Sequence, residues 1–325
     1  MLSIEQILNR IESEISKISF SLSPPSLFEP INYTLSLGGK RLRPSLALLA
    51  YNIYKDNLED IIKPAIGFEI FHNFTLLHDD LMDQADKRRS QPTVHKKWNT
   101  NTAILSGDAM VIAAYQFIGE TPEPFLKKIL NLFSQTALEI CCGQQFDMEF
   151  EKTDSVTEEQ YLEMIRLKTA VLIACCLKAG ALIGGASDKD AEIFYQFGID
   201  IGLSFQLQDD MLDVYGDTNS FGKNIGGDIL CNKKTFLLIN AINRADKEQQ
   251  DKMKYYTNPA NIFSANEKIK AYTEIYNQLN IKNITQKKIN SIFEIAMNRL
   301  DNLDVNQERL SELKKYCYIL MYRET

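Results

Sequence analysis

The sequence predicts an all-α protein. Apolar residues recur at intervals of three and four along most of the 325 residues, for example at Ile4, Ile7 and Ile11, which is the spacing of one helix face. Runs that alternate apolar and polar residues, as half-buried strands do, are absent from the sequence. Gly and Pro residues mark short turns between the periodic segments, as at 38–39. We therefore expect a bundle of ten or more helices around a central cavity.

Composition and punctuation favour a single domain. Apolar residues make up 45% and charged residues 24% of the chain, close to the average of globular proteins, which excludes disordered, collagen-like and coiled-coil rod architectures. Ser-Val-Thr-Glu-Glu at 155–159 and Ser187-Asp188 open periodic segments; both are helix start signals. No Ser/Gly-rich or single-sign linker divides the chain, so we expect residues 1–325 to form one domain.

Charge and hydropathy indicate a cytoplasmic protein rather than a nucleic-acid-binding or membrane protein. The net charge of −7 argues against a phosphate-backbone partner. The first 15 residues contain neither a basic region nor an apolar one, so we expect no signal peptide. The most apolar stretch, 170–186, contains Lys178 and is shorter than the ~20 residues of a transmembrane helix. We expect a buried helix there and no transmembrane segment.

The cysteines show no metal-binding pattern. None of the six is spaced as in a CxxC motif, and they fall at Cys141, Cys142, Cys175, Cys176, Cys231 and Cys317. Neighbouring cysteines on a helix diverge by about 100° and cannot converge on one ion. We expect them to be reduced and buried as small apolar side chains.

One segment departs from the helical pattern. Residues 216–228, GDTNSFGKNIGGD, contain four Gly, two Asn and one Ser, too many helix breakers for a helix and more residues than most helix connections have. Long irregular loops in compact domains are often lids over functional sites. We expect this loop to act as a lid.

Two DDxxD motifs carry the chemistry. Asp79, Asp80 and Asp83 form the first, and 209–213 contains the second, with Asp209, Asp210 and Asp213. On a helix, residues i and i+4 lie about 6 Å apart on one face, so each motif presents two carboxylates side by side. Apolar runs precede both motifs, which suits aspartates at the mouth of a buried cavity. Such pairs repel each other unless a cation lies between them.

Oxygen ligands without a Cys or His set suit Mg²⁺, which keeps several waters and is commonly completed by substrate phosphate. Cations that could meet such a phosphate occur in three clusters. The clusters are Lys40, Arg41 and Arg43; Arg88 and Arg89; and Lys223, Lys233 and Lys234. A di-iron centre would need two ExxH motifs, and the chain has only one, Glu69 to His72. The sequence therefore favours a magnesium-dependent diphosphate site.

Five ordered segments resemble the trans-isoprenyl diphosphate synthases, or polyprenyl synthetases. They are GGKRLRP at 38–44, LLHDDLMDQADKRRSQPTVHKKW at 76–98, LKTA at 167–170, FQLQDDMLDVYGD at 205–217 and FGKNIGGDILCNKKTF at 221–236. The resemblance implies condensation of isopentenyl diphosphate with an allylic diphosphate. Class I terpene cyclases share the first motif but typically replace the second, so the second DDxxD points to chain elongation.

The resemblance also implies residue roles. Asp79 and Asp83 would bind two Mg²⁺ and Asp209 a third, with Asp80, Asp210 and Asp213 acting mostly through water. The allylic diphosphate would be held by Arg88, Lys168 and Lys223, and isopentenyl diphosphate by Lys40, Arg43, His72 and Arg89 with Lys233 nearby. Thr169, Gln206 and the Lys168 carbonyl would face the reacting carbons. A homodimer is also implied.

The length of the product depends on the helix that carries the first motif. Thr75, Phe71 and Phe68 lie one, two and three turns before Asp79, and the phenylalanines could form the floor of the tail cavity. The resemblance points instead to Phe74, five positions before the motif. Either floor limits the product to short chains, and we favour C20, then C15. A class I terpene cyclase and a non-catalytic partner subunit remain the alternatives.

Overall fold

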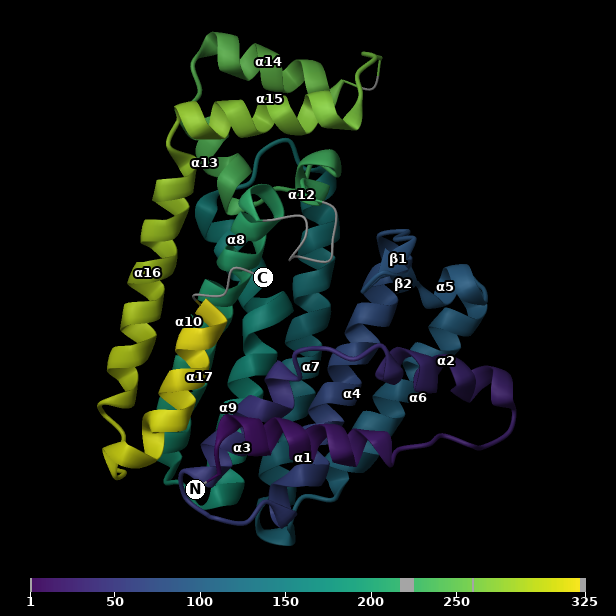
Figure 1. Ribbon diagram of the computed structural model, residues 1–325, viewed down its shortest axis with the longest axis vertical. Helices are drawn as coiled ribbons and strands as arrows, with labels where there is room; N and C mark the ends of the chain where they lie inside the picture. The colour runs from purple at the N-terminus through teal and green to yellow at the C-terminus, as the bar shows by residue number, and fades with distance from the viewer. Residues whose placement is uncertain (1, 217–224, 259, 322–325) are drawn as a thin grey trace. The chain divides into compact units, whose positions relative to one another are not determined.

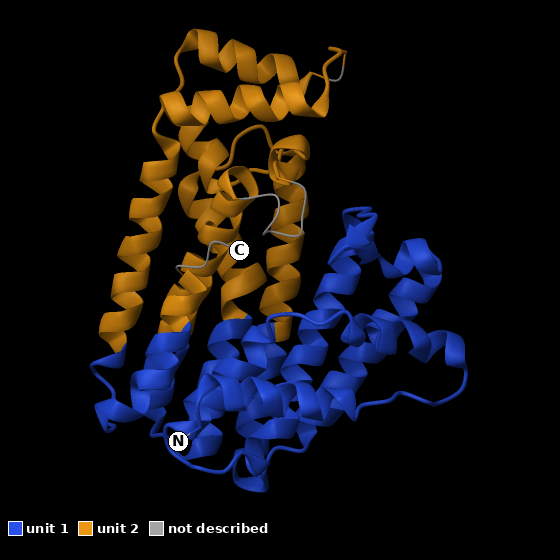
Figure 2. Ribbon diagram, viewed as in Figure 1, with its two compact units in different colours: residues 1–136, 172–196, 300–316 blue, residues 137–171, 197–299, 317–325 orange. Residues whose placement is uncertain are grey.

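The computed structural model describes residues 2–216, 225–258 and 260–321, which are almost entirely helical (Figure 1). The prediction of an all-α protein with ten or more helices is confirmed. Packing divides the chain into two compact units (Figure 2), residues 1–136, 172–196 and 300–316 and residues 137–171, 197–299 and 317–325. The expectation that residues 1–325 form one domain stays a prediction.

The helices and strands divide between the two units. The first unit contains α1 (Ile4–Ser16), α2 (Pro25–Ser36), α3 (Leu42–Asn52), α4 (Glu59–Met82), β1 (Lys87–Arg88), β2 (Gln91–Pro92), α5 (Val94–Lys97), α6 (Thr100–Gly119) and the 3₁₀ turn η2 (Gln307–Leu310). The second contains α8 (Glu158–Ile165), the π-helical turn η1 (Arg166–Ala170), α12 (Gly227–Leu230), α13 (Phe236–Arg244), α14 (Lys247–Thr257) and α15 (Ala265–Gln278). Five helices contribute residues to both units: α7 (Glu123–Lys152), α9 (Val171–Gly184), α10 (Asp188–Tyr215), α16 (Ile281–Leu300) and α17 (Ser311–Met321).

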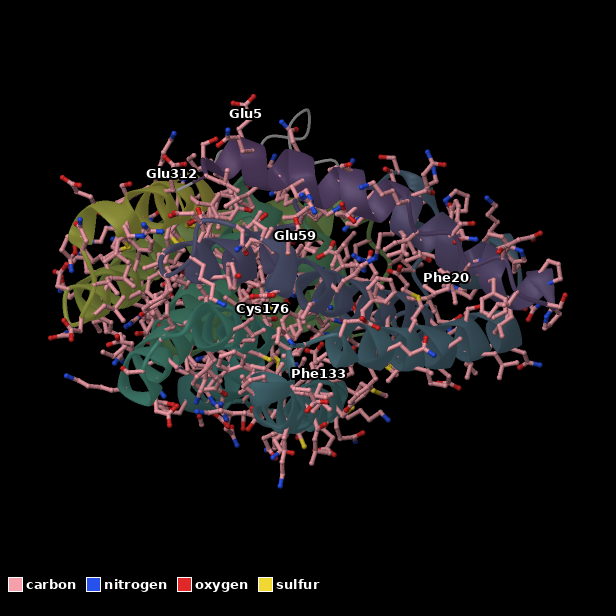
Figure 3. All side chains as sticks on the ribbon, turned by 90° about the horizontal axis from the view of Figure 1, so that it is seen from below. Glu5, Phe20, Glu59, Phe133, Cys176 and Glu312 are labelled. Carbon is pink, nitrogen blue, oxygen red and sulfur yellow. The ribbon has the colours of Figure 1, made fainter. Side chains whose placement is uncertain are left out.

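The core of the first unit is built around α4, which packs against α3 and α6. The rings of Phe68 and Phe71 are buried and contact Phe133, with centroids 5.9 and 4.9 Å apart. Figure 3 shows Phe133 and Cys176 inside the layer of side chains and Glu5 projecting outward from α1. Aromatic burial of this kind contributes a large share of a helical core.

The core of the second unit is formed by α13, α14 and α15. Figure 1 shows α14 and α15 as an adjacent pair of helices. Leu237 on α13 packs in one cluster with Ile275 and Tyr276 on α15, all of them at most 2% exposed. Capping boxes at Asp246 and Ser264 fix the starts of both outer helices.

Among the described residues, two helical segments are long and apolar enough to cross a bilayer by length and composition alone. They are Thr100–Gly119 and Glu158–Gly184. In the second, 83% of the most apolar window is buried, as in a core helix, whereas in the first the fraction is 39%. The expectation that the chain has no transmembrane segment stays a prediction.

The prediction that all six cysteines are buried is wrong for half of them. Cys175, Cys176 and Cys317 are buried, but Cys141, Cys142 and Cys231 are exposed, and no disulfide joins any of the six. The buried stripe of α7 passes through Ile129, Phe133 and Ile140. Cys141 and Cys142 follow this stripe by one and two residues, so they turn away from it.

One arginine of the first unit is turned into the core. Arg41 has a left-handed backbone with φ 46° and is only 3% exposed. Its guanidinium donates to Glu12 Oε1 at 2.8 Å, Glu69 Oε1 at 3.1 Å and the Leu35 carbonyl at 3.2 Å. The expectation that Arg41 is available to a phosphate is therefore wrong: it ties the 38–41 turn to α1 and α4.

Removing Arg41 is expected to destabilise the protein strongly. Arg41→Met leaves the Glu69 carboxylate, which is 2% exposed, without its countercharge, at a cost of about 3–5 kcal/mol of unfolding free energy. Urea denaturation measures this, and Glu12→Gln on the exposed side should cost about 1 kcal/mol or less. The double variant Arg41→Met/Glu69→Met should recover most of the loss. A single variant as stable as wild type would contradict the role of this ion pair.

Candidate active site

The first aspartate motif lies at the C-terminal end of α4. Asp79 and Asp80 occupy its last turn and Asp83 is its C-cap residue. The Asp83 N–H donates to the Asp79 carbonyl at 2.8 Å, so the helix continues to this point and Asp79 and Asp83 share one face. This confirms the local geometry that the spacing predicts. It gives two neighbouring carboxylates one helical turn apart.

A β-hairpin with a two-residue turn places Arg88 beside this motif. Arg88 Nε lies 2.7 Å from Asp80 Oδ2, and its Nη2 lies 3.8 Å from Asp79 Oδ2. Burial raises the pKa of the Asp80 carboxyl, and the Arg88 guanidinium opposes this rise. Arg89 and Ser90 both have positive φ, 51° and 64°, as in a type I′ turn between paired strands. The sequence has no alternating strand pattern at these residues, so this hairpin departs from the all-α prediction.

A second cationic group surrounds His72 on α4. Burial holds the pKa of His72 well below its ordinary value, and the neighbouring Arg43 and Arg89 lower it further. The Arg89 guanidinium also donates to the Gly38 carbonyl. Lys40 follows that glycine turn, and its carbonyl accepts from the Tyr316 hydroxyl at 3.5 Å. The first unit therefore brings a neutral imidazole and two guanidiniums together.

Arg88 and Arg89 also line a common pocket in the first unit, together with Asn73, Asp80 and Tyr33. The two cations come from adjacent residues but have different partners, Asp80 for Arg88 and the Gly38 carbonyl for Arg89. The pocket thus combines two guanidinium groups with a buried carboxylate, which is bonded to one of them. An anion could bind to either guanidinium by charge-assisted hydrogen bonds.

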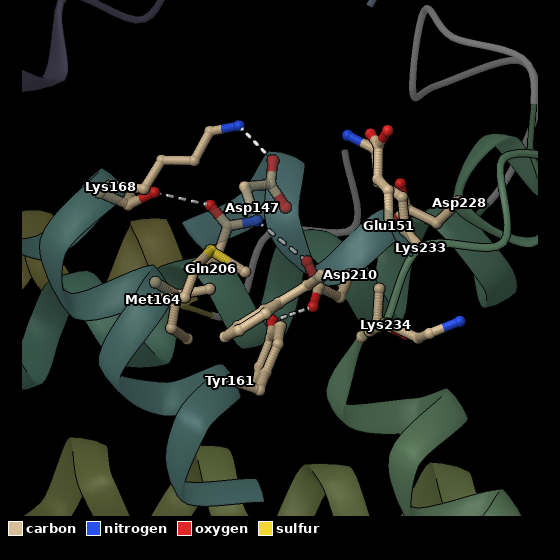
Figure 4. A pocket seen from close by; sticks show the side chains of 14 residues that line it. Asp147, Glu151, Tyr161, Met164, Lys168, Gln206, Asp210, Asp228, Lys233 and Lys234 are labelled. Carbon is tan, nitrogen blue, oxygen red and sulfur yellow. Dashed lines mark hydrogen bonds and ion pairs between the residues drawn. The ribbon is translucent and has the colours of Figure 1, made fainter. Parts of the chain in front are cut away.

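The second unit contains a pocket that gathers most of the remaining candidates (Figure 4). Lys168 and Thr169 come from η1, Gln206 and Asp210 from α10, and Lys233 from the segment after α12. The complete lining is Asp147, Phe150, Glu151, Tyr161, Met164, Ile165, Lys168, Thr169, Gln206, Asp210, Asp228, Lys233, Lys234 and Thr235. Cations and carboxylates therefore share one cavity.

A chain of hydrogen bonds fixes the polar groups of this pocket. The Thr169 hydroxyl donates to Gln206 Oε1 at 3.1 Å, and Gln206 Nε2 donates to Asp210 Oδ1 at 2.9 Å. The Tyr161 hydroxyl donates to the other oxygen of Asp210. Burial, and then the charge of Asp228, raises the pKa of Asp210 to about 8. The hydrogen bonds to Thr169 and Asp210 hold the amide of Gln206 in one orientation.

The end of the predicted lid is attached to the second motif. The Gly226 N–H donates to the Asp213 carbonyl at 2.7 Å, and the Asp228 N–H donates to Asp213 Oδ2 at 3.0 Å. Gly226 has φ 84° and α12 begins directly after it, so the last residues of the 216–228 loop are helical. Residues 217–224, including Lys223, lie outside the described residues.

Lys268 on α15 holds the segment that leads to Lys233. Its ammonium group donates to the Leu230 carbonyl at 3.1 Å and to Asn232 Oδ1 at 2.6 Å. Asn232 has φ 54°, and this left-handed residue turns the chain into the pocket. Lys233 and Lys234 then reach the lining.

The aspartate pairs fit Mg²⁺ better than a metal ion whose ligands all come from the protein. Within residues 2–216, 225–258 and 260–321, no three His, Cys, Asp or Glu side chains are placed to hold an ion. Each motif offers two carboxylates one turn apart. Mg²⁺ is commonly bound by one or two carboxylates, with waters and substrate phosphates completing the shell. The donor set on the chain is of this kind.

The residues expected to limit chain length differ in their surroundings. Phe71 is 2% exposed and packs against Phe133, whereas Phe74 is only half-buried. The Phe74 ring lies 5.3 Å from that of Phe71 and 4.8 Å from that of His78. The Thr75 hydroxyl donates to the His72 carbonyl at 2.8 Å. Phe71 thus belongs to the core, while Phe74 is less enclosed.

Several residues of the two sites were missed by sequence reasoning. Asp147 on α7 bonds Lys168 Nζ at 2.6 Å, Tyr161 bonds Asp210, and Asp228 shapes the charge of the second pocket. None of these belongs to a repeated motif. Glu69 was noticed only as half of an ExxH pattern, and its position three residues before His72 is the one signal that could have found it.

Comparisons with known proteins point to a single family. A family model described as polyprenyl synthetase matches residues 24–277. A geranylgeranyl diphosphate synthase of Methanosarcina mazei is 40% identical over 252 residues, 76% of this chain and 78% of that protein. The crystal structure of a geranylgeranyl pyrophosphate synthase has a TM-score of 0.94 and 39% identity, with 100% of both chains covered. A second crystal structure is that of the Corynebacterium glutamicum geranylgeranyl pyrophosphate synthase, complexed with isoprenyl diphosphate and magnesium. It has a TM-score of 0.85 and 26% identity, with 98% of this chain and 96% of that chain covered.

His72→Gln is expected to flatten the pH dependence of stability. Folded His72 stays neutral because its pKa lies well below 6.5, but in the unfolded chain it takes up a proton near that pH. Stability is therefore present above the unfolded pKa and lost as the pH falls below it, by about 1–2 kcal/mol between pH 7 and 5. Urea unfolding of both proteins at these pH values measures the difference. Parallel curves would contradict a neutral His72 in the folded protein.

Proposed function

The chain belongs to the polyprenyl synthetase family, and from this premise we propose that it is a short-chain synthase that makes a C20 all-trans prenyl diphosphate. It is a trans-prenyltransferase, which joins isopentenyl diphosphate to an allylic diphosphate and releases diphosphate. The observation that carries the proposal is the presence of two DDxxD helices, each with its own set of cations. The geranylgeranyl products named for the relatives support C20 over C15.

The metal ions are assigned from the aspartate motifs. The family uses a divalent metal, and one related synthase was solved with magnesium. Three Mg²⁺ would bind, two at Asp79 and Asp83 and a third at Asp209, with Asp80, Asp210 and Asp213 acting through water. When bound, these ions absorb the negative charge that develops on the leaving diphosphate. The carboxylates of Asp79, Asp83 and Asp209 would hold these ions.

The cations divide between the two substrates. Arg88, Lys168 and Lys223 would hold the allylic diphosphate, and Lys40, Arg43, His72, Arg89 and Lys233 would hold isopentenyl diphosphate. The placement of Arg43 and Arg89 beside neutral His72 supports the second set, because all three side chains can donate hydrogen bonds to an anion. Arg88 would exchange part of its contact with Asp80 for the substrate.

The remaining residues would stabilise the reacting carbons. The allylic C–O bond breaks with its electron pair on oxygen, and the double bond of isopentenyl diphosphate attacks the resulting cation. The oxygens of Thr169 and Gln206 would present negative dipoles to this cation, and the hydrogen bond from Gln206 to Asp210 supports this role. The proton lost from isopentenyl diphosphate would pass to the released diphosphate. Closure of the 216–228 loop would exclude water.

A homodimer is proposed from one face of α6. Ile104, Leu105 and Ile112 are 41%, 59% and 63% exposed, and they share one side of the helix. A second copy of the chain would cover this apolar face, and the mass in analytical ultracentrifugation tests it. A cytoplasmic location also stays a prediction.

Two alternatives give different results in one assay. A class I terpene cyclase would release hydrocarbon from an allylic diphosphate alone, and a non-catalytic partner subunit would be inactive by itself. The proposed synthase should incorporate radiolabelled isopentenyl diphosphate with C5, C10 and C15 primers. Chromatography of the products identifies chain length directly. Hydrocarbon formation without isopentenyl diphosphate would contradict the proposal.

Removing a metal ligand is expected to stop catalysis without unfolding the protein. Asp79→Ala and Asp209→Ala should each lower kcat by about 10³-fold or more, because catalysis depends on charge stabilisation at the metal. Helix content by circular dichroism should be unchanged. Asp251→Ala on the outer helix α14 is the matched control and should retain wild-type activity. Activity within tenfold of wild type for either ligand variant would remove that aspartate from the metal site.

Phe74→Ala is expected to lengthen the product beyond C20, because it opens the less enclosed of the two aromatic positions. Phe71→Ala removes a core ring and should cost about 3–5 kcal/mol of stability. Product chromatography and thermal melting of both variants separate cavity depth from packing. Longer products from Phe71→Ala alone would assign the floor to Phe71. A wild-type product of C30 or longer would contradict both assignments.

A further inference from the structure

We propose that α7 is the element that positions Lys168 and Thr169, through two positioning residues, Gly143 and Asp147. This inference rests on the proposed roles of Lys168 and Thr169. Neither positioning residue belongs to the motifs that define the two aspartate sites. Both lie on one face of α7, four residues apart.

Lys168 and Thr169 lie on a widened helical turn. Residues Arg166–Ala170 form η1, and the Val171 N–H donates to the carbonyl of Arg166, five residues earlier. A π turn of this kind is less stable than an α-helical turn and persists only where its surroundings hold it. The position of both functional side chains therefore depends on what packs against η1.

Two glycines allow neighbouring helices to touch this turn. A Cβ at Gly143 on α7 would lie 2.3 Å from the Lys168 backbone nitrogen and 2.7 Å from its Cα. A Cβ at Gly202 on α10 would lie 2.5 Å from the Cα of Ala170. Only glycine permits such approaches. The backbone of η1 is thus in direct contact with α7 on one side and α10 on the other.

One turn further along α7, Asp147 fixes the side chain that leaves this backbone. Asp147 Oδ2 lies 2.6 Å from Lys168 Nζ, and the two side chains are only 17% and 23% exposed. Figure 4 shows this bond at the edge of the pocket, with Gln206 and Asp210 bonded beside it. Partial burial lets the charge pair restrict the ammonium more than a surface pair does. Gly143 thus sets the backbone of the turn, and Asp147 sets the direction of the lysine.

The test uses Asp147, because an added Cβ at Gly143 would disturb packing as well as position. Asp147→Asn keeps the size of the side chain and removes its charge. We expect kcat/KM for the allylic diphosphate to fall about 10–100-fold while the KM for isopentenyl diphosphate changes less than twofold. Asp147→Glu should recover part of the loss. Glu149→Gln, two residues along the same helix, is the matched control and should behave as wild type.

A double-mutant cycle separates this inference from the proposed function. If Asp147 acts through Lys168, Asp147→Asn should add less than about twofold to the defect of Lys168→Ala. Full additivity, or wild-type kinetics of Asp147→Asn beside an impaired Lys168→Ala, would overturn the inference and leave the role of Lys168 intact. Wild-type kinetics of Lys168→Ala would instead remove the proposed role on which the inference rests.

Discussion

The burial of carboxylates is the constraint on which the rest of the structure depends. Asp80 and Asp210 are each 5% exposed, and a buried carboxyl group without hydrogen-bond partners costs several kcal/mol. The first is matched by Arg88, and the second by Tyr161 and Gln206. These partners come from the hairpin and from α8 and α10. Elements that look peripheral in the chain are therefore anchored by polar contacts to the motifs.

The helices could be predicted from sequence because their signals are local. The start signal at 155–159 contains Thr157, the N-cap residue of α8, because such signals depend on neighbours along the chain. The β1–β2 hairpin could not be predicted. Its strands have two residues each, and Arg89 and Ser90 adopt positive φ without the Asn-Gly or Asp-Gly pair that usually marks such turns.

The site was predictable where one helix determines the geometry and unpredictable where distant residues do. Asp79 and Asp83 share a face by helical spacing alone. Arg41 lies between Lys40 and Arg43 in the sequence, but its side chain points inward. Its backbone is left-handed, and its guanidinium donates to Glu69, 28 residues later in the chain. The widened turn at Lys168 has no sequence signature, since it depends on how closely α7 and α10 approach it.

The hairpin has a consequence for how two anions could influence each other. Arg88 is the last residue of β1, and Arg89 is the first residue of the turn. The two residues are therefore adjacent, but the guanidinium of Arg88 is bonded to Asp80 and that of Arg89 to the Gly38 carbonyl. Because the two residues are adjacent, a shift in the backbone of one is expected to displace the other. If the two arginines bind different diphosphates, binding of one diphosphate changes the binding free energy of the other. This coupling is reciprocal. The short hairpin is then a mechanical coupling between the substrates of a bimolecular reaction.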